Sequence, residues 1–328
     1  MSVSFPGLGI HDLVIDKVAF SVFGQPIYWY GITISLGFML ALAYAYFNHK
    51  RFNINLDKLL DTVVVATVAG IIGARTYYVV FNWNDYKGNP ASIFDFRSGG
   101  LAIYGCVIFA FISAYAVCRI RKLNTLDFLD IGSLGFLIGQ AVGRWGNFFN
   151  QEAYGRNTTL PWGMFSTGDM GNYGTYEWLA RNQETLSRAG VEVNPELPVH
   201  PCFLYESLWC ALGLVLLHFI SKKRKFSGQI FLCYGIWYGA GRFFIEALRT
   251  DSLMFFGTSV KASQLVAVLA VVICGLMLAV NLNKLQKAGR QELADGDAVA
   301  EGGDVESAAE AEDTPDQEQP EDSIAEEE

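Results

Sequence analysis

The chain has 328 residues, of which 52% are hydrophobic and 17% are charged, a composition that excludes an ordinary soluble domain and indicates a protein with several membrane spans. Its formal net charge of −9 is unevenly distributed, because residues 291–328 hold 16 of the 33 acidic residues and no lysine or arginine. Residues 1–290 carry 17 acids and 24 bases, a net charge of +7. We therefore expect a mildly basic membrane body and a cytoplasmic tail, residues 283–328, that begins basic, becomes acidic and stays disordered for lack of apolar surface.

Seven apolar runs approach the length of about 20 residues that a helix needs to cross a bilayer. They cover residues 27–47, 60–81, 100–119, 126–149, 203–220, 228–248 and 263–282. These runs predict an all-α integral membrane protein with seven transmembrane helices in residues 27–282. Clusters of lysine, arginine and histidine follow the first, third, fifth and seventh runs, and they share one side of the membrane if the N-terminus is outside and the C-terminus inside.

The remaining segments predict two external parts. Residues 1–26 contain Asp12 and Asp16 and lack a basic start and a small-residue cleavage site, so we expect an external N-terminal segment rather than a removable signal peptide. Residues 150–201 are too long for a simple turn and hold enough aromatic, proline and glycine residues to form a small folded cap.

The cysteines and histidines show no metal-ligand spacing. The six cysteines form no C-x-x-C pair, and the four histidines stand far apart at positions 11, 49, 200 and 218. We therefore expect no metal and no cofactor, and we expect no nucleic-acid partner.

Polar side chains that are unusual in lipid occur near the outer ends of six helices in this topology. They are Tyr28, Tyr30, Arg75, Tyr104, Arg144, Asn147, Tyr205, Glu206, Tyr238, Arg242, Glu246 and Arg249. The last four lie on one face of the sixth helix, because they are spaced by one or two helical turns. The pattern predicts a single polar site at the level of the outer leaflet.

The charges at this level indicate an anion. A charge at the bilayer centre costs about 2.5–3.5 kcal/mol, so each arginine needs a partner or a wet cavity. Taken singly, Arg242 could pair with Glu246, and each tyrosine could be an interfacial anchor. Taken together, Arg75, Arg144 and Arg242 exceed Glu206 and Glu246, and a planar guanidinium binds phosphate oxygens in a bidentate manner. The simplest anion at this depth is a phospholipid head group.

Five sequence blocks resemble those of bacterial prolipoprotein diacylglyceryl transferases. Residues 143–152 read GRWGNFFNQE, are followed by Gly155, and are similar to the family's signature. The other blocks are YWYG at 28–31, GGLAIYG at 99–105, HPCFLYE at 200–206 and YGAGRFFIE at 238–246. They stand in family order over about residues 20–282. The long signature is specific, whereas the short tyrosine–glycine blocks are weak by themselves.

The resemblance implies a multi-pass enzyme of the bacterial plasma membrane whose site faces the outer leaflet. Such an enzyme transfers the diacylglyceryl group of phosphatidylglycerol to the thiol of the lipobox cysteine in a prolipoprotein and releases glycerol phosphate. The implied partners are phosphatidylglycerol, prolipoprotein signal peptides and membrane lipids.

The resemblance also implies roles for individual residues. Arg144 and Arg242 would stabilise the charge that grows on the leaving phosphate. Asn147 and Gly155 would shape the head-group pocket. Glu206 and Glu246 would orient the arginines or bind the glycerol hydroxyls. The remaining expected lipid-binding residues are Tyr30, Arg75 and Glu152.

One position departs from the family pattern. Many relatives have a histidine where this chain has Tyr104, and that histidine is the usual candidate for the base. Tyrosine, with a pKa of about 10, is a poor base at neutral pH unless nearby arginines lower its pKa. Tyr104 either accepts the thiol proton or only positions the thiol, in which case water, Tyr238 or a carboxylate accepts it. We expect His200 to order the return of the cap to the membrane rather than to act as the base.

Two other classes of function fit parts of the pattern. A transporter or channel for an anion would need ionisable groups near the midplane and aqueous paths on both sides, whereas these groups cluster at one level. A non-catalytic lipid-binding protein would explain the arginines but not the signature at residues 143–152.

Overall fold

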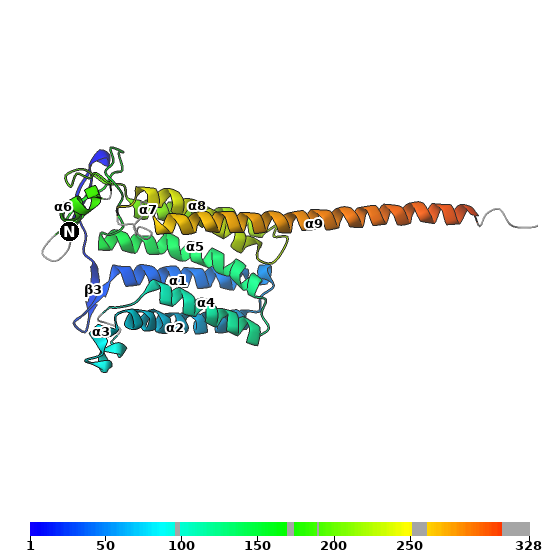
Figure 1. Cartoon of the computed structure of the whole chain (residues 1–328), viewed down its shortest axis with the longest axis horizontal. Coiled ribbons are helices and arrows are strands. Elements are labelled where there is room, and N and C mark those ends of the chain that lie inside the picture. Colours follow the sequence, from blue (N-terminus) through cyan, green and yellow to red (C-terminus); the bar gives the residue numbers. More distant parts are fainter. Residues whose placement is uncertain (96–98, 169–173, 189, 251–260, 310–328) are drawn as a thin grey trace, which may run out of the picture. The chain divides into compact units, whose positions relative to one another are not determined.

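The computed structural model describes residues 1–95, 99–168, 174–188, 190–250 and 261–309, with side chains described as far as residue 288. The chain divides into two units, residues 1–276 and residues 277–328. In the first unit the long helices lie side by side (Figure 1). Its long helices are α1 (Trp29–Asn48), α2 (Leu56–Phe81), α4 (Ile103–Ile120), α5 (Thr125–Asn150), α7 (Cys202–Ser221), α8 (Gln229–Leu248) and the start of α9 (Ala262–Ala309).

Within the described residues, six helices are long and apolar enough to cross a membrane: α1, α2, α4, α5, α7 and α9. Helix α8 has 20 residues but is not in this group, because Gln229, Arg242 and Glu246 lower its hydropathy. The chain is therefore a mostly helical protein of membrane type. The seventh span and the orientation of the helices stay predictions.

Polar caps define the ends of the two longest helices of the bundle. The side chain of Asn55 accepts a hydrogen bond from the amide of Lys58 and begins α2, and Asn124 accepts one from the amide of Leu126 and begins α5. Helix α5 ends at Gln151, which has a left-handed backbone with φ of 51°. The helix therefore ends inside the signature block at residues 143–152. After the left-handed residue, the amide of Glu152 donates to the carbonyl of Asn147 in the last turn of α5.

Helix α5 occupies the centre of the bundle, where it contacts α1, α7 and α8 (Figure 1). Its contact with α1 is close, because a Cβ atom at Gly37 would lie 3.2 Å from the Cα of Gly139. Helix α2 packs instead against α4, where Gly73 and Gly105 face each other. Small residues of this kind allow helix backbones to approach without a hydrophobic driving force. The bundle therefore consists of an α2–α4 pair and a group arranged around α5.

The N-terminal segment forms strands, which an all-α prediction does not include. The strands are β1 (Ser2–Phe5), β2 (Ile10–Val14), β3 (Val18–Val22), β4 (Gln25–Tyr28) and, much later in the chain, β5 (Phe165–Thr167). Strand β1 lies between β2 and β5 in an antiparallel sheet, and β3 and β4 form a hairpin that leads directly into α1. No local pattern in the sequence predicts this arrangement, because the partner of β1 is supplied by the segment that follows α5.

Residues 150–201 share an apolar core with the N-terminal strands. This core contains Val3 and Ile15 together with Tyr154, Met164, Leu179 and Val199, and it reaches Phe148 and Phe203 at the ends of α5 and α7. Helix α6 (Thr175–Arg188) turns its buried side chains, including Leu179 and Leu186, to this core. The cap is thus anchored on α5 and α7, the helices that carry the signature block and Glu206.

Helix α9 continues as helical backbone to Ala309, beyond the end of the predicted apolar run at residue 282. Residues 283–309 contain six alanines, which favour a helix, together with four glycines and three aspartates, which do not. The backbone is helical over this stretch, and the disorder of the tail stays a prediction. Residues 310–328, which carry the rest of that prediction, lie outside the described residues.

Candidate active site

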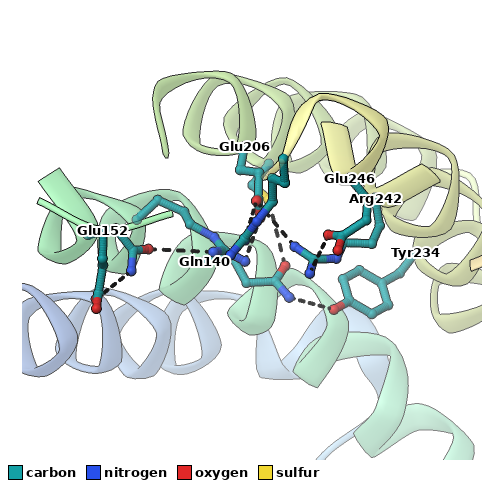
Figure 2. A network of polar contacts seen from close by, with 10 residues as sticks. Gln140, Glu152, Glu206, Tyr234, Arg242 and Glu246 are labelled. Carbon is teal, nitrogen blue, oxygen red and sulfur yellow. Dashed lines mark hydrogen bonds and ion pairs between the residues drawn. The ribbon is translucent and has the colours of Figure 1, made fainter. Parts of the chain in front are cut away.

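Glu206 of α7 is the common partner of three arginines from two other segments. Its side chain is almost completely buried. Oε2 pairs with Nη2 of Arg144 at 2.5 Å, while Oε1 pairs with Nη1 of Arg242 at 3.3 Å and with Nη1 of Arg249 at 3.4 Å. Figure 2 shows Glu206 above Gln140, with Arg242 and Glu246 on one side. One carboxylate therefore holds together guanidinium groups from α5, from α8 and from the residue that follows α8.

A second buried carboxylate, Glu246, holds Arg242 from the same face of α8. Its Oε2 lies 2.6 Å from Nη2 of Arg242, four residues earlier on the helix. Arg242 thus bridges Glu206 and Glu246. The ion pair expected from the four-residue spacing of Arg242 and Glu246 is therefore present, and Arg242 contacts Glu206 at the same time.

The end of α5 extends this network toward the cap. Arg144 Nη1 donates to Oδ1 of Asn147 at 3.5 Å, and Nδ2 of Asn147 donates to Oε1 of Glu152 at 2.8 Å. Asn150 Nδ2 donates to the same oxygen at 3.3 Å. The left-handed turn at Gln151 brings Glu152 within reach of both asparagines. Figure 2 follows the network from Glu152 to Glu246.

The charged side chains of the network differ in exposure. Three arginines, at 144, 242 and 249, contact the buried carboxylates at 206 and 246. The side chains of Arg144 and Arg242 are 20% and 21% exposed, whereas those of Glu206 and Glu246 are 5% and 3% exposed. The two arginine side chains are therefore more accessible than the carboxylates that hold them.

The described hydrogen bonds of Arg75 go to main-chain carbonyls and not to the carboxylates of this network, so its expected role in lipid binding beside Arg144 and Arg242 stays a prediction. Its side chain is buried in the α2–α4 half of the bundle and donates to five main-chain carbonyls at 2.7–3.1 Å. Those carbonyls belong to Ser92, Ile93, Asp95, Gly99 and Gly100. The guanidinium of Arg75 therefore fixes the connection between α2 and α4.

The other predicted site residues lie at different distances from the network. The ring of Tyr30 packs against Gly146, where a Cβ atom would lie 2.6 Å from ring carbon Cδ2. Tyr238 lies close enough to Arg144 for the charge of the guanidinium to act on its hydroxyl, and its ring stacks on Tyr234 at 5.6 Å between centroids. Tyr104, by contrast, is 62% exposed at the start of α4. Among the described residues it has a ring neighbour, Tyr77, but no hydrogen bond or ion pair with the network.

Gly155 has a packing reason for its lack of a side chain. A Cβ atom there would lie 2.6 Å from Cβ of His200 and 3.0 Å from Sγ of Cys202. Its amide donates to the carbonyl of His200 at 3.0 Å, and its backbone forms a bridge to Arg249. Gly155 therefore joins the cap to the segment that follows α8, next to an arginine that pairs with Glu206.

The comparison with known proteins covers the whole network. A sequence model described as "Prolipoprotein diacylglyceryl transferase" matches residues 17–280. The chain belongs to this family. It is 42% identical over 274 residues to the phosphatidylglycerol--prolipoprotein diacylglyceryl transferase of Clostridium novyi (strain NT), a match that covers 84% of this chain and 98% of the relative. The enzymes of the same name from Finegoldia magna and Enterococcus faecalis are 43% and 40% identical, over 82% and 77% of this chain and 97% and 86% of the relatives.

Membership of the prolipoprotein diacylglyceryl transferase family does not by itself reveal three contacts of the site. Arg249 was visible from its spacing after Arg242 and Glu246, but only the structure pairs it with Glu206. Lys261 is buried, and its Nζ donates to the carbonyls of Glu246 at 2.6 Å and Arg249 at 2.7 Å, at the end of α8. Gln140 donates to the hydroxyl of Tyr234 at 3.0 Å. No motif or spacing pointed to the last two contacts.

His200 of this transferase-family chain lies in a chain of hydrogen bonds between the cap and α7. Trp162 Nε1 can only donate, and it donates to the hydroxyl of Tyr205 at 2.8 Å. The Tyr205 hydroxyl shares a second hydrogen bond with Nδ1 of His200 at 3.0 Å. Burial lowers the pKa of His200 from its ordinary value of 6.5. This chain of contacts ties Trp162 of the cap to α7, as expected for a residue that orders the return of the cap.

We predict that acid weakens the fold through His200. Because its pKa is lower in the folded chain, the unfolded chain takes up the proton first as the pH falls below about 6.5. The contribution of His200 to stability is therefore complete above that pH and decreases as the pH falls toward the folded pKa. Thermal unfolding in detergent at pH 7.5 and 5.5 should show a smaller loss of stability for His200→Gln than for the wild type. Equal losses in the two proteins would refute this prediction.

Proposed function

We propose that this chain transfers the diacylglyceryl group of phosphatidylglycerol to the thiol of a prolipoprotein's lipobox cysteine. The observation that carries the proposal is the pair of partly exposed arginine side chains, Arg144 and Arg242, that share the buried carboxylate of Glu206. They form a preorganised site for one phosphodiester, within a chain of the prolipoprotein diacylglyceryl transferase family.

The proposed reaction is a displacement at the glyceryl carbon that bears the phosphate. The cysteine sulfur forms a bond to this carbon while the carbon–oxygen bond to the phosphate breaks, and the thiol proton leaves to a base. The products are a thioether-linked diacylglyceryl peptide and glycerol phosphate. Arg144 and Arg242 stabilise the negative charge on the departing phosphate, and Asn147 and Glu152 lie where they can bind the glycerol end of the head group.

A hollow beside Arg144 supports a lipid as the substrate. It has a volume of about 410 Å³ and lies between α1, α5 and α7. It is lined by Thr33, Leu36, Ala141, Val142, Trp145, Phe149 and Ser207. Trp145 directly follows Arg144 and Ser207 directly follows Glu206, so the hollow and the ionic network lie on the same turns of α5 and α7. This arrangement suits a ligand with a charged head and hydrocarbon chains.

The proposed topology has seven spans, with α8 as the sixth, the N-terminus outside and the C-terminus inside. The basic residues that follow α1, α4 and α7, and those of α9 beyond its apolar part (Lys284, Lys287 and Arg290), support this orientation. Helix α8 can cross the membrane despite its charges, because Arg242 is paired with Glu206 and Glu246. In this topology the ionic network faces the outer leaflet of the bacterial plasma membrane. Residues 1–26 and the cap lie outside, where a prolipoprotein arrives after export, and residues 283–328 lie in the cytoplasm.

A direct assay tests the proposal. The purified protein is incubated with phosphatidylglycerol labelled in the diacylglyceryl group and with a lipobox peptide, and the mass of the peptide and the release of glycerol phosphate are measured. We expect the peptide to gain one diacylglyceryl group per glycerol phosphate released. A matched peptide with serine in place of cysteine should gain none. Movement of the lipid across vesicles without a peptide adduct would overturn the proposal and favour a transporter.

Tyr104→Phe is expected to retain wild-type turnover within a factor of about three, because Tyr104 is exposed at the start of α4 and the described contacts do not join it to the ionic network. Loss of a general base would instead lower turnover about a hundredfold or more. Turnover is measured with the peptide assay, and Tyr115→Phe, an exposed tyrosine of the same helix, is the control. A loss of a hundredfold in Tyr104→Phe alone would assign the proton transfer to Tyr104. Retained activity leaves Tyr238, water or a carboxylate as the acceptor.

A further inference from the structure

Trp209 of α7 and Trp237 of α8 form a reciprocal pair. Their rings are stacked, with 4.3 Å between centroids and an angle of 16° between planes. Nε1 of Trp209 donates to the main-chain carbonyl of Trp237 at 3.0 Å, and Nε1 of Trp237 donates to the carbonyl of Trp209, also at 3.0 Å. Each indole therefore bonds to the backbone of the opposite helix, so the pair fixes both the separation and the register of α7 and α8.

Two glycines make room for this pair. Gly213 stands four residues after Trp209, and Gly241 stands four residues after Trp237. A Cβ atom at Gly213 would collide with the indole of Trp237, and one at Gly241 would collide with the indole of Trp209. The same tryptophan–glycine spacing thus occurs on both helices, and each glycine receives the ring of the opposite tryptophan.

The pair lies next to the ionic network but does not belong to it. Glu206 precedes Trp209 by one turn of α7, and Arg242 directly follows Gly241 on α8. The described hydrogen bonds of the two indoles go to main-chain carbonyls and not to the guanidinium or carboxylate groups. The ion pair between Arg242 and Glu206 spans the same two helices at 3.3 Å. A small change in the separation of α7 and α8 would therefore change the distance between Arg242 and Glu206.

We infer that Trp209 and Trp237 are positioning residues for the anion site. The pair sets the spacing of α7 and α8 at which Glu206 holds Arg242 and Arg144 together. Both guanidinium groups then face the same phosphate. This inference rests on the proposed function, because it assigns the effect of the pair to binding of the phosphatidylglycerol head group.

The test uses Trp209→Phe and Trp237→Phe, made separately in the full chain. Phenylalanine keeps an aromatic ring and removes one N–H. The carbonyl that loses this donor keeps its ordinary bond within the helix, so no buried polar group is left without a partner. We expect kcat/KM for phosphatidylglycerol to fall about tenfold, since misplacement by 1 Å can cost a hundredfold, while KM for the lipobox peptide stays within about twofold. Trp83→Phe, an exposed tryptophan of α3 (Trp83–Tyr86), is the control and should match the wild type.

A matched pair of glycine variants separates this role from general helix packing. Gly213→Ala disturbs the contact of α7 with α8, whereas Gly235→Ala disturbs the contact of α8 with Cys274 of α9. We expect Gly213→Ala to raise KM for phosphatidylglycerol and Gly235→Ala to leave it unchanged. Equal increases in the two variants would overturn the inference.

Three further outcomes separate failure of the positioning role from failure of the proposed function. If the wild type transfers lipid and both phenylalanine variants keep wild-type values of KM and kcat for phosphatidylglycerol, the positioning role is refuted and the proposed function stands. If neither phenylalanine variant yields folded protein, the pair holds the bundle and not specifically the anion site, which also overturns the inference. Absence of transfer by the wild type would instead refute the proposed function.

Discussion

Arg144→Ala is expected to lower the turnover of phosphatidylglycerol about a hundredfold or more, the loss typical when one preorganised charge-stabilising donor is removed. Arg144 is one of the two partly exposed arginines and lies 2.5 Å from Glu206. The fold should persist, because Glu206 retains its contacts with Arg242 and Arg249. Turnover and KM are measured with the labelled lipid and lipobox peptide, and melting temperature is measured in parallel.

Two further variants sharpen this experiment. Arg144→Lys keeps the charge but removes the planar fork, so its activity should lie closer to that of alanine than to that of the wild type. Arg188→Ala, in the cap helix α6, removes an arginine whose side chain is 77% exposed and should leave turnover unchanged. Near-normal turnover by Arg144→Ala would remove Arg144 from the proposed mechanism.

Glu206→Gln is expected to destabilise the fold by about 3 kcal/mol, the lower end of the effect of removing one partner from a buried ion pair. The lower end applies because the arginines are partly exposed and therefore partly hydrated, whereas Glu206 itself is buried. Three guanidinium groups would lose their shared carboxylate and would repel one another. The free energy of unfolding in a fixed detergent is the quantity to measure, together with turnover, which should also fall.

Controls for Glu206→Gln come from the same chain. Glu184→Gln removes an exposed partner of Arg188 and should leave stability unchanged. Adding Arg144→Gln to Glu206→Gln should recover part of the lost stability, because one of the repelling charges is then absent. If Glu206→Gln were as stable as the wild type, the structural role assigned to this carboxylate would be wrong.

The long helices follow from the sequence almost residue by residue. The apolar run at 126–149 becomes α5 over Thr125–Asn150, and the run at 203–220 becomes α7 over Cys202–Ser221. A continuous apolar segment bounded by polar caps has few alternatives in a membrane, where each backbone group must bond within its own helix. Strand β1 could not be predicted in this way, because its pairing depends on β5, which lies beyond four long helices.

The candidate site was predictable in part. The signature block and the spacing of Arg242 and Glu246 pointed to residues that the structure does bring together. Arg75 was grouped with them because its depth in the membrane is similar, but depth does not specify the direction in which a side chain points. The contact of α2 with α4 turns Arg75 toward the carbonyls of the connection between these helices.

The sequence by itself determined which segments are helices and which polar residues lie near their predicted outer ends, because these depend on local hydropathy and on position along a helix. The tertiary structure alone decided which arginines share Glu206, since that depends on the rotation and pairing of helices. Close glycine contacts such as Gly37 with Gly139, and side-chain bonds between distant segments, set that rotation, and no single helix carries the information by itself.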